Sequence, residues 1–98
     1  MLTVEELLHL AHSDGADALS LHVGSPPILV MDGKPQAVDS PVITPQDAQD
    51  FWHALADTRQ RRTLREKGEL EFLYSFRDRA SFVVRAKLNG ENIQLDIH

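Results

Sequence analysis

The residue pair in this sequence that most suggests catalysis is Gly33-Lys34, because a Gly-Lys pair closes the loop that holds nucleotide phosphates in many ATPases. That loop also needs a glycine five positions earlier and a Ser or Thr directly after the lysine. Here Ile28 stands at the first of these positions and Pro35 at the second. The phosphate loop is therefore missing from the sequence, and we expect no ATP hydrolysis by this chain alone.

Histidine spacing raises the question of a metal site. His9 and His12 are three residues apart in a segment that we expect to be helical, so two imidazoles could approach one metal ion. The nearby carboxylate is Asp14, and a third ligand would have to come from elsewhere in the fold. Two solvent-exposed helix residues explain the pattern without a metal, and we predict no metal site. The sequence reveals no partner for the other histidines, His22, His53 and His98.

Serine and carboxylate side chains give no sign of catalysis either. No serine lies in the Gly-x-Ser-x-Gly context of a nucleophile elbow. Glu69 and Glu71 share one face of an expected strand, opposite Arg85 and Lys87 on the next strand. Cross-strand pairing, worth a few tenths to ~1 kcal/mol per pair, accounts for these charges. We predict no catalytic residue and no cofactor.

Two segments are candidate interaction surfaces. The first is basic and holds half of the ten Lys and Arg residues, namely Arg59, Arg61, Arg62, Arg65 and Lys67. It could meet an acidic partner surface, or it could be a solvated helix with pairs such as Arg62 with Glu66. The second is the rigid turn at Ser25, Pro26 and Pro27, which could otherwise serve only to connect two strands.

Composition limits the class of protein. The 98 residues are long enough for one domain, residues 1–98, and too short for two. There are no cysteines, and the net charge of −5 argues against a nucleic-acid partner. No apolar run approaches the ~20 residues of a membrane span, and the amino terminus lacks the lysines of a signal peptide. We therefore expect a cytoplasmic domain without membrane insertion.

The first half of the chain predicts a helix, a hairpin and two more helices. Thr3 and Glu6 are typical of a capped helix start, and the alternation around Leu19 indicates a half-buried strand. Asp32-Gly33 favours a tight hairpin, with the return strand at a sheet edge because of Pro35. Further helix starts are expected in two places, Thr44-Pro45 and Asp57.

The last third predicts a three-stranded antiparallel meander. Apolar residues alternate along residues 70–76, 82–88 and 93–97, and turns are expected at Arg77-Asp78 and Asn89-Gly90. Together these elements predict an α+β domain, with an antiparallel sheet covered by about three helices. The exposed edge strand at residues 34–38 could pair with a second copy and form a homodimer.

An ordered set of motifs carries a family resemblance over nearly the whole chain. It consists of Gly24-Ser25-Pro26-Pro27, Val30-Met31-Asp32-Gly33, the segments 57–61 and 68–72, and Arg79-Ala80-Ser81-Phe82-Val83-Val84-Arg85-Ala86. In this set the sequence resembles the amino-terminal domain of the hexameric PilT-type twitching-motility and type II secretion ATPases. The resemblance implies a PAS-like fold, and no counterpart of the ATPase domain itself lies in these residues.

The resemblance also implies a role that this sequence does not fully support. In the family, arginines of this domain reach the nucleotide bound by a neighbouring subunit. Two of those basic positions fall on Ser81 and Val83, which cannot supply a guanidinium. Arg79 and Arg85 lie nearby, and we keep them as interaction candidates only. The family's Ser-Asp-Leu-His is also altered, since Asp17 is displaced by one residue, which we expect to turn it to the other face of the strand.

Three interpretations follow from the sequence. The first is a non-catalytic interaction or assembly domain that docks on a pilus or secretion ATPase subunit, or on itself. The second is a PAS-like sensory module that holds a small ligand in its core, which rests on analogy of fold alone. The third is the amino-terminal fragment of a longer, divergent secretion ATPase.

Overall fold

The computed structural model describes residues 2–76 and 80–98 of the chain. The expected turn at Arg77-Asp78 and the candidate residue Arg79 lie outside these residues. The elements run in the order α1 (Val4–Ser13), β1 (Ala18–Leu21), β2 (Ile28–Met31), β3 (Lys34–Ala37), α2 (Pro45–Leu55), α3 (Thr58–Lys67), β4 (Glu69–Phe76), β5 (Ala80–Asn89) and β6 (Asn92–Ile97). The α+β class, the helices and the meander predicted from the sequence are confirmed.

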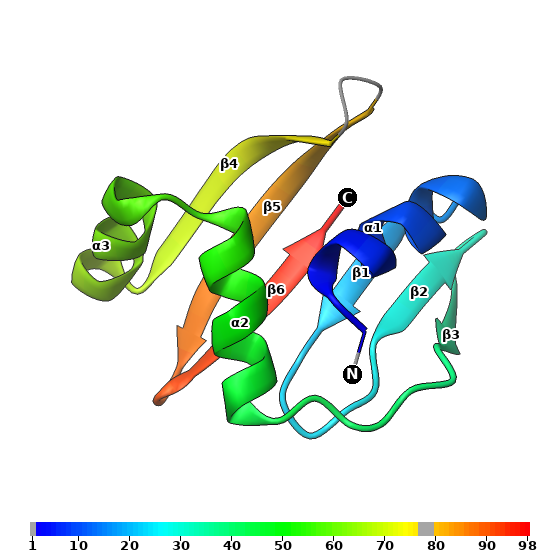
Figure 1. The fold of residues 1–98 in the computed structure, drawn as a ribbon, viewed down its shortest axis with the longest axis horizontal. Helices are drawn as coiled ribbons and strands as arrows, with labels where there is room; N and C mark the ends of the chain where they lie inside the picture. The colour runs from blue at the N-terminus through cyan, green and yellow to red at the C-terminus, as the bar shows by residue number, and fades with distance from the viewer. Residues whose placement is uncertain (1, 77–79) are drawn as a thin grey trace.

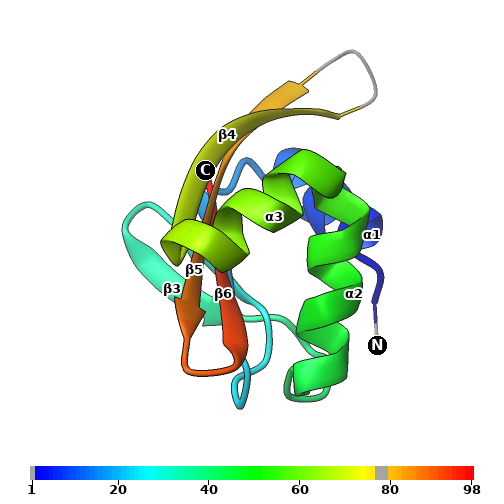
Figure 2. The same ribbon diagram turned by 90° about the vertical axis from the view of Figure 1, so that its left-hand side faces the viewer.

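All six strands form one antiparallel sheet in the order β3-β2-β1-β6-β5-β4. The pairing of β1 with β6 joins the hairpin of the first half to the meander of the second, with Leu19 opposite Ile97 and Leu21 opposite Leu95. The three helices lie against one face of the sheet, as the two perpendicular views show (Figures 1 and 2). The opposite face, which we call the open sheet face, carries no helix in the described parts of the chain.

Local signals place each helix start where the sequence predicts it. Thr3, Thr44 and Asp57 are the cap residues, and the side chain of each accepts a hydrogen bond from the backbone N–H three residues on. The residue at that third position returns a bond to the cap backbone, so each helix begins with a complete capping box. Helix α3 ends at Gly68, whose φ of 79° is the left-handed conformation that glycine adopts without a Cβ clash.

The hairpin between β2 and β3 also follows its sequence signal. Asp32 and Gly33 have φ values of 52° and 76°, the positive angles of a tight hairpin turn. Pro35 lies opposite Val30 on β3, at the edge of the sheet, where its missing N–H removes no ladder bond. Asp17 lies one residue before β1 begins, not on the strand as expected, and its Oδ2 accepts a bond from the Asp32 N–H at 3.1 Å.

The core lies between the helices and the covered face of the sheet. Apolar residues from α1 and α2 meet alternate residues of the central strands, and the fully buried ones include Leu7, Leu8, Leu19, Leu21, Val84, Leu95 and Ile97. The ring of Trp52 is 3% exposed and packs against Phe72 with ring centroids 5.9 Å apart, so this indole serves the core. In the described residues no helix is both long and apolar enough to cross a bilayer.

Candidate protein-interaction surfaces

The basic segment predicted from the sequence is helix α3. Its buried Leu64 faces the sheet, and its basic side chains project outward, with Arg59, Arg62, Arg65 and Lys67 exposed. Arg61 is half-buried and donates to the Ala56 carbonyl at 3.5 Å and to the Thr58 hydroxyl at 3.3 Å. Arg61 therefore supports the junction between α2 and α3, while the four exposed cations are accessible to a partner.

The turn at residues 24–27 is built into the fold. Pro27 is fully buried, and Ser25 and Pro26 are half-buried. The backbone of Gly24 and Ser25 pairs with that of Ile43, through Gly24 N–H to Ile43 O at 2.8 Å and Ile43 N–H to Ser25 O at 2.9 Å. A partner can therefore touch this turn at Ser25 and Pro26, whereas Pro27 contributes to the packing.

Arg85 lies on the open sheet face and is bound within the chain. Its Nε and one terminal nitrogen both donate to the Glu71 carboxylate, at 3.0 and 2.8 Å. These hydrogen bonds, and then the charge of Glu71, raise the pKa of the Arg85 guanidinium. The cross-strand pairing of Glu71 with Arg85 is confirmed, and it holds the guanidinium against the sheet.

A polar cluster on the same face was missed by sequence reasoning. His22 has a partner, because its Nε2 lies 3.0 Å from Oδ1 of Asp96, and the Ser20 hydroxyl donates to that same oxygen at 3.0 Å. No partner for His22 was visible in the sequence, but the folded chain provides one in Asp96. Asp96 also lies opposite Arg85 in the β5–β6 register. No local signal could have found this cluster, since His22 and Asp96 are 74 residues apart and meet only when β1 pairs with β6.

An apolar position stands beside these charges. Leu73 is 73% exposed in the middle of β4 and lies opposite Val83 of β5. Leu73 alternates with the inward-facing residues of β4, so its side chain lies on the open sheet face. This face therefore has an exposed leucine next to the Glu71–Arg85 pair.

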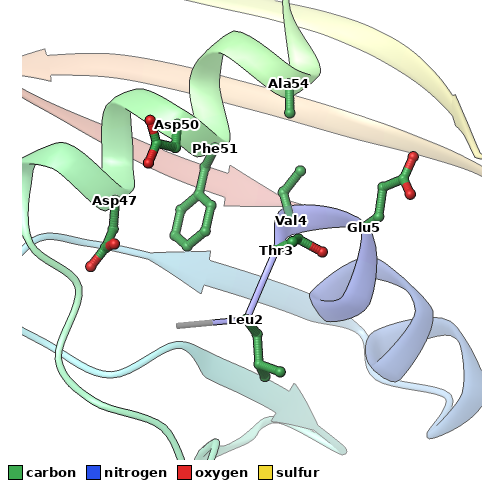
Figure 3. A pocket seen from close by; sticks show the side chains of 8 residues that line it. All are labelled: Leu2, Thr3, Val4, Glu5, Asp47, Asp50, Phe51 and Ala54. Atoms are coloured by element: carbon green, nitrogen blue, oxygen red, sulfur yellow. The ribbon is translucent and has the colours of Figure 1, made fainter.

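A groove of about 400 Å³ separates the beginning of α1 from α2. Its apolar lining comes from Leu2, Val4, Phe51 and Ala54. Carboxylates stand at its margins, with Asp47 and Asp50 on the α2 side and Glu5 on the α1 side (Figure 3). Each helix start was predicted correctly, but the approach of the two helices, and so the groove, depends on tertiary packing.

The histidines of α1 are both exposed, and a metal centre finds no support in the parts of the chain that the structure covers. His9 and His12 lie on the outer side of the helix. Among the described residues there is no group of three or more His, Cys, Asp or Glu side chains placed to hold a metal ion.

The fold matches part of two solved ATPases. Over its full length the chain superposes on a part of the pilus retraction motor PilT, solved with bound ADP, with a TM-score of 0.90 and 24% identity. The match to the Legionella pneumophila ATPase DotB covers 99% of this chain, with a TM-score of 0.81 and 18% identity.

These matches confirm, at the level of fold, the resemblance predicted from the sequence. The chain spans 29% of the length of the PilT chain and 29% of the DotB chain. No family model matches the sequence, and no curated protein sequence matches it either. The shared fold is therefore established by structure, and the activity of PilT and DotB is that of their longer chains.

Proposed function

We propose that this domain is a non-catalytic protein-interaction module of a type IV pilus or type II secretion system, and that it docks on a motor ATPase subunit in the cytoplasm. The observation that carries the proposal is the superposition of the entire chain on part of PilT with a TM-score of 0.90. Because the same fold forms part of a pilus retraction motor in PilT, we propose that here it binds such a motor.

The described residues lend no support to the nucleotide chemistry of a motor. Gly33 and Lys34 belong to the tight hairpin between β2 and β3, whereas a phosphate loop connects a strand to a helix N-terminus. Ser81 and Val83 stand where the resemblance implies arginines, and Arg85 is held by Glu71. These features favour a role in assembly or regulation over hydrolysis.

We assign the docking contact to the open sheet face around Leu73. A leucine that is 73% exposed loses most of its water contact when a partner covers it, and the adjacent Glu71–Arg85 pair can orient that partner. The test is co-elution of the domain with the purified motor ATPase of the same organism in size-exclusion chromatography at tens of micromolar. We expect co-elution with the original protein and its loss with Leu73→Asp.

Val42 provides the matched control, because it is the other exposed large apolar residue in the described part of the chain, at 53%, and lies in the connection between β3 and α2. Val42→Asp makes a comparable apolar-to-acidic change and should leave co-elution intact. Failure of the original domain to co-elute would refute docking, and equal effects of the two variants would refute the assignment to the open sheet face. ATP turnover by the domain alone would refute its non-catalytic role.

A second candidate is favoured by the 29% coverage of both motors, namely that the domain is one part of a longer, divergent ATPase. The reading frame of the gene decides between the two. A phosphate loop encoded in frame with this domain would establish the longer protein, and a stop codon directly after His98 would exclude it.

A further inference from the structure

Charges of opposite sign are segregated among the three helices. Helices α1 and α2, which the structure describes in full, carry the acidic residues Glu5, Glu6, Asp47 and Asp50, with no Lys or Arg. Helix α3 carries five basic residues and one acidic residue, Glu66. Neither of the two ion pairs found among the described residues involves α3 or the groove. The molecule therefore presents an acidic surface and a basic surface that do not neutralise each other within one chain.

The acidic residues of α2 and the basic residues of α3 match in spacing as well as in sign. Asp47 and Asp50 are three residues apart on α2, and Arg59 and Arg62 are three residues apart on α3. Residues at this spacing lie on one side of a helix with Cβ atoms ~5–6 Å apart, so two carboxylates and two guanidinium groups can face each other in register. Asp50, Arg59 and Arg62 are exposed, and Asp47 is partly exposed.

The groove between α1 and α2 suits arginine rather than a bare point charge. Its lining is apolar at Leu2, Val4, Phe51 and Ala54, and its carboxylates stand at the rim. An arginine can lay its aliphatic stem along such a floor while the guanidinium reaches an acidic rim. Asp47 remains ionised there, because hydrogen bonds from the backbone and side chain of Thr44 lower the pKa of its carboxyl.

We propose that the acidic groove of one copy receives helix α3 of a second copy, so that the domain associates head to tail. The two surfaces are different parts of the molecule, and none of the groove residues belongs to α3. A contact between unlike surfaces leaves one groove and one α3 free in every pair, so association continues beyond the dimer. This contact is separate from the docking of the open sheet face on a motor.

Association of the original protein is measured first, by light scattering and sedimentation velocity at several protein concentrations and two salt concentrations. At about 0.01 M salt, where charges act over ~30 Å, we expect a mass that rises with concentration past that of two 11.0 kDa chains. At about 1 M salt, where the range is ~3 Å, we expect the monomer. A monomer under both conditions overturns the proposal.

Two neutralising variants then isolate the two surfaces. Glu5→Gln with Asp50→Asn removes rim charges from the groove but spares Asp47, whose carboxylate accepts the Thr44 N–H in the capping box of α2. Arg59→Gln with Arg62→Gln removes charges from α3. All four positions are exposed, so circular dichroism should show both variants folded. Each variant alone should remain monomeric at low salt.

The mixture of the two variants is the decisive measurement. The groove variant retains an intact α3 and the α3 variant retains an intact groove, so an equimolar mixture should form a one-to-one pair and stop there. Lys34→Gln with Asp39→Asn is the matched control, since it removes one exposed charge of each sign outside both surfaces and should associate like the original protein. A mixture that stays monomeric, or single variants that still associate, refutes the head-to-tail contact.

Other occupants of the groove give distinct results. A mass that levels off at two chains in both variants would place the contact at another surface, such as the edge strand β3, and refute the proposal. A different result would be that the original protein is monomeric and that the groove variant no longer co-elutes with the motor. That result would indicate that a basic segment of the motor occupies the groove, and it would refute self-association. Loss of co-elution with Leu73→Asp alone would leave the self-association result unchanged.

Discussion

Truncation of Leu95 tests the junction on which the fold depends, the pairing of β6 with β1. Leu95 is fully buried in β6, opposite Leu21 of β1 and Ala86 of β5, and so lies where the two halves of the sheet meet. Leu95→Ala removes about three carbon groups worth ~0.8 kcal/mol each, and the cavity left behind adds to that loss. We expect the free energy of unfolding to fall by about 3–4 kcal/mol, a large part of the ~5–15 kcal/mol typical of such a domain.

Urea unfolding followed by fluorescence measures this change. Trp52 is the single tryptophan and is 3% exposed, so its emission reports on the core without labelling. The control is Leu73→Ala, the same chemical change at a position that is 73% exposed, for which we expect a change within about 0.5 kcal/mol. The free energy of unfolding should fall with urea concentration at the same slope in both variants as in the original protein, since the surface exposed on unfolding is nearly unchanged.

The comparison of the two leucines can refute the assignment of faces. If Leu73→Ala cost as much as Leu95→Ala, Leu73 would be buried in the free domain, and the open sheet face would not be open. If Leu95→Ala cost less than about 1 kcal/mol, the β1–β6 junction would not be part of the cooperative core.

Two further predictions concern the helix ends. Hydrogen bonds to the backbone and side chain of the cap residue lower the pKa of Glu6 and of Asp47 below their ordinary values of 4.5 and 3.8. A carboxyl with a lowered pKa in the folded state stabilises the protein above its unfolded pKa, so stability should hold at neutral pH and fall as the pH drops through 4.5 and below. Glu6→Gln with Asp47→Asn should flatten that fall in acid denaturation followed by circular dichroism, and an unchanged pH dependence would contradict the role of these two groups. Gly68→Ala should lower the free energy of unfolding by about 1–2 kcal/mol, because Gly68 has a φ of 79°, and thermal unfolding with no change in midpoint would show that the strain is absent.

Much of the fold was predictable because its signals are local. The capping residues Thr3, Thr44 and Asp57 mark the helix starts through bonds that span three residues, and they form wherever the chain turns helical. Asp32-Gly33 specifies its hairpin through the positive φ angles it tolerates. The alternation along β4, β5 and β6 fixed which residues share a face, and the observed register agrees with it.

The candidate surfaces were only partly predictable. The basic residues of α3 could be read from composition, since five cations in one short segment must lie near each other in space. The sequence did not show that Pro27 is buried or that Arg61 donates to the Ala56 carbonyl. Nor did it show that Arg85 donates to the Glu71 carboxylate through Nε and one terminal nitrogen. Each of these outcomes depends on which neighbour the folded chain brings into reach.

Local signals in the sequence predicted the order of the elements, the three helix starts, and the buried and exposed sides of β1, β4, β5 and β6, because capping, turn and period-2 signals act over a few residues. They did not set every boundary, since Asp17 lies before β1 and not on it. Only the folded chain places β6 beside β1, which brings His22 to Asp96. The packing of α1 against α2, which forms the groove, is likewise a feature of the folded chain. Alternation assigns residues to faces but does not set the order of strands. That order is selected by the burial of a shared core, to which residues more than seventy positions apart contribute together, such as Leu19 with Ile97 and Leu21 with Leu95.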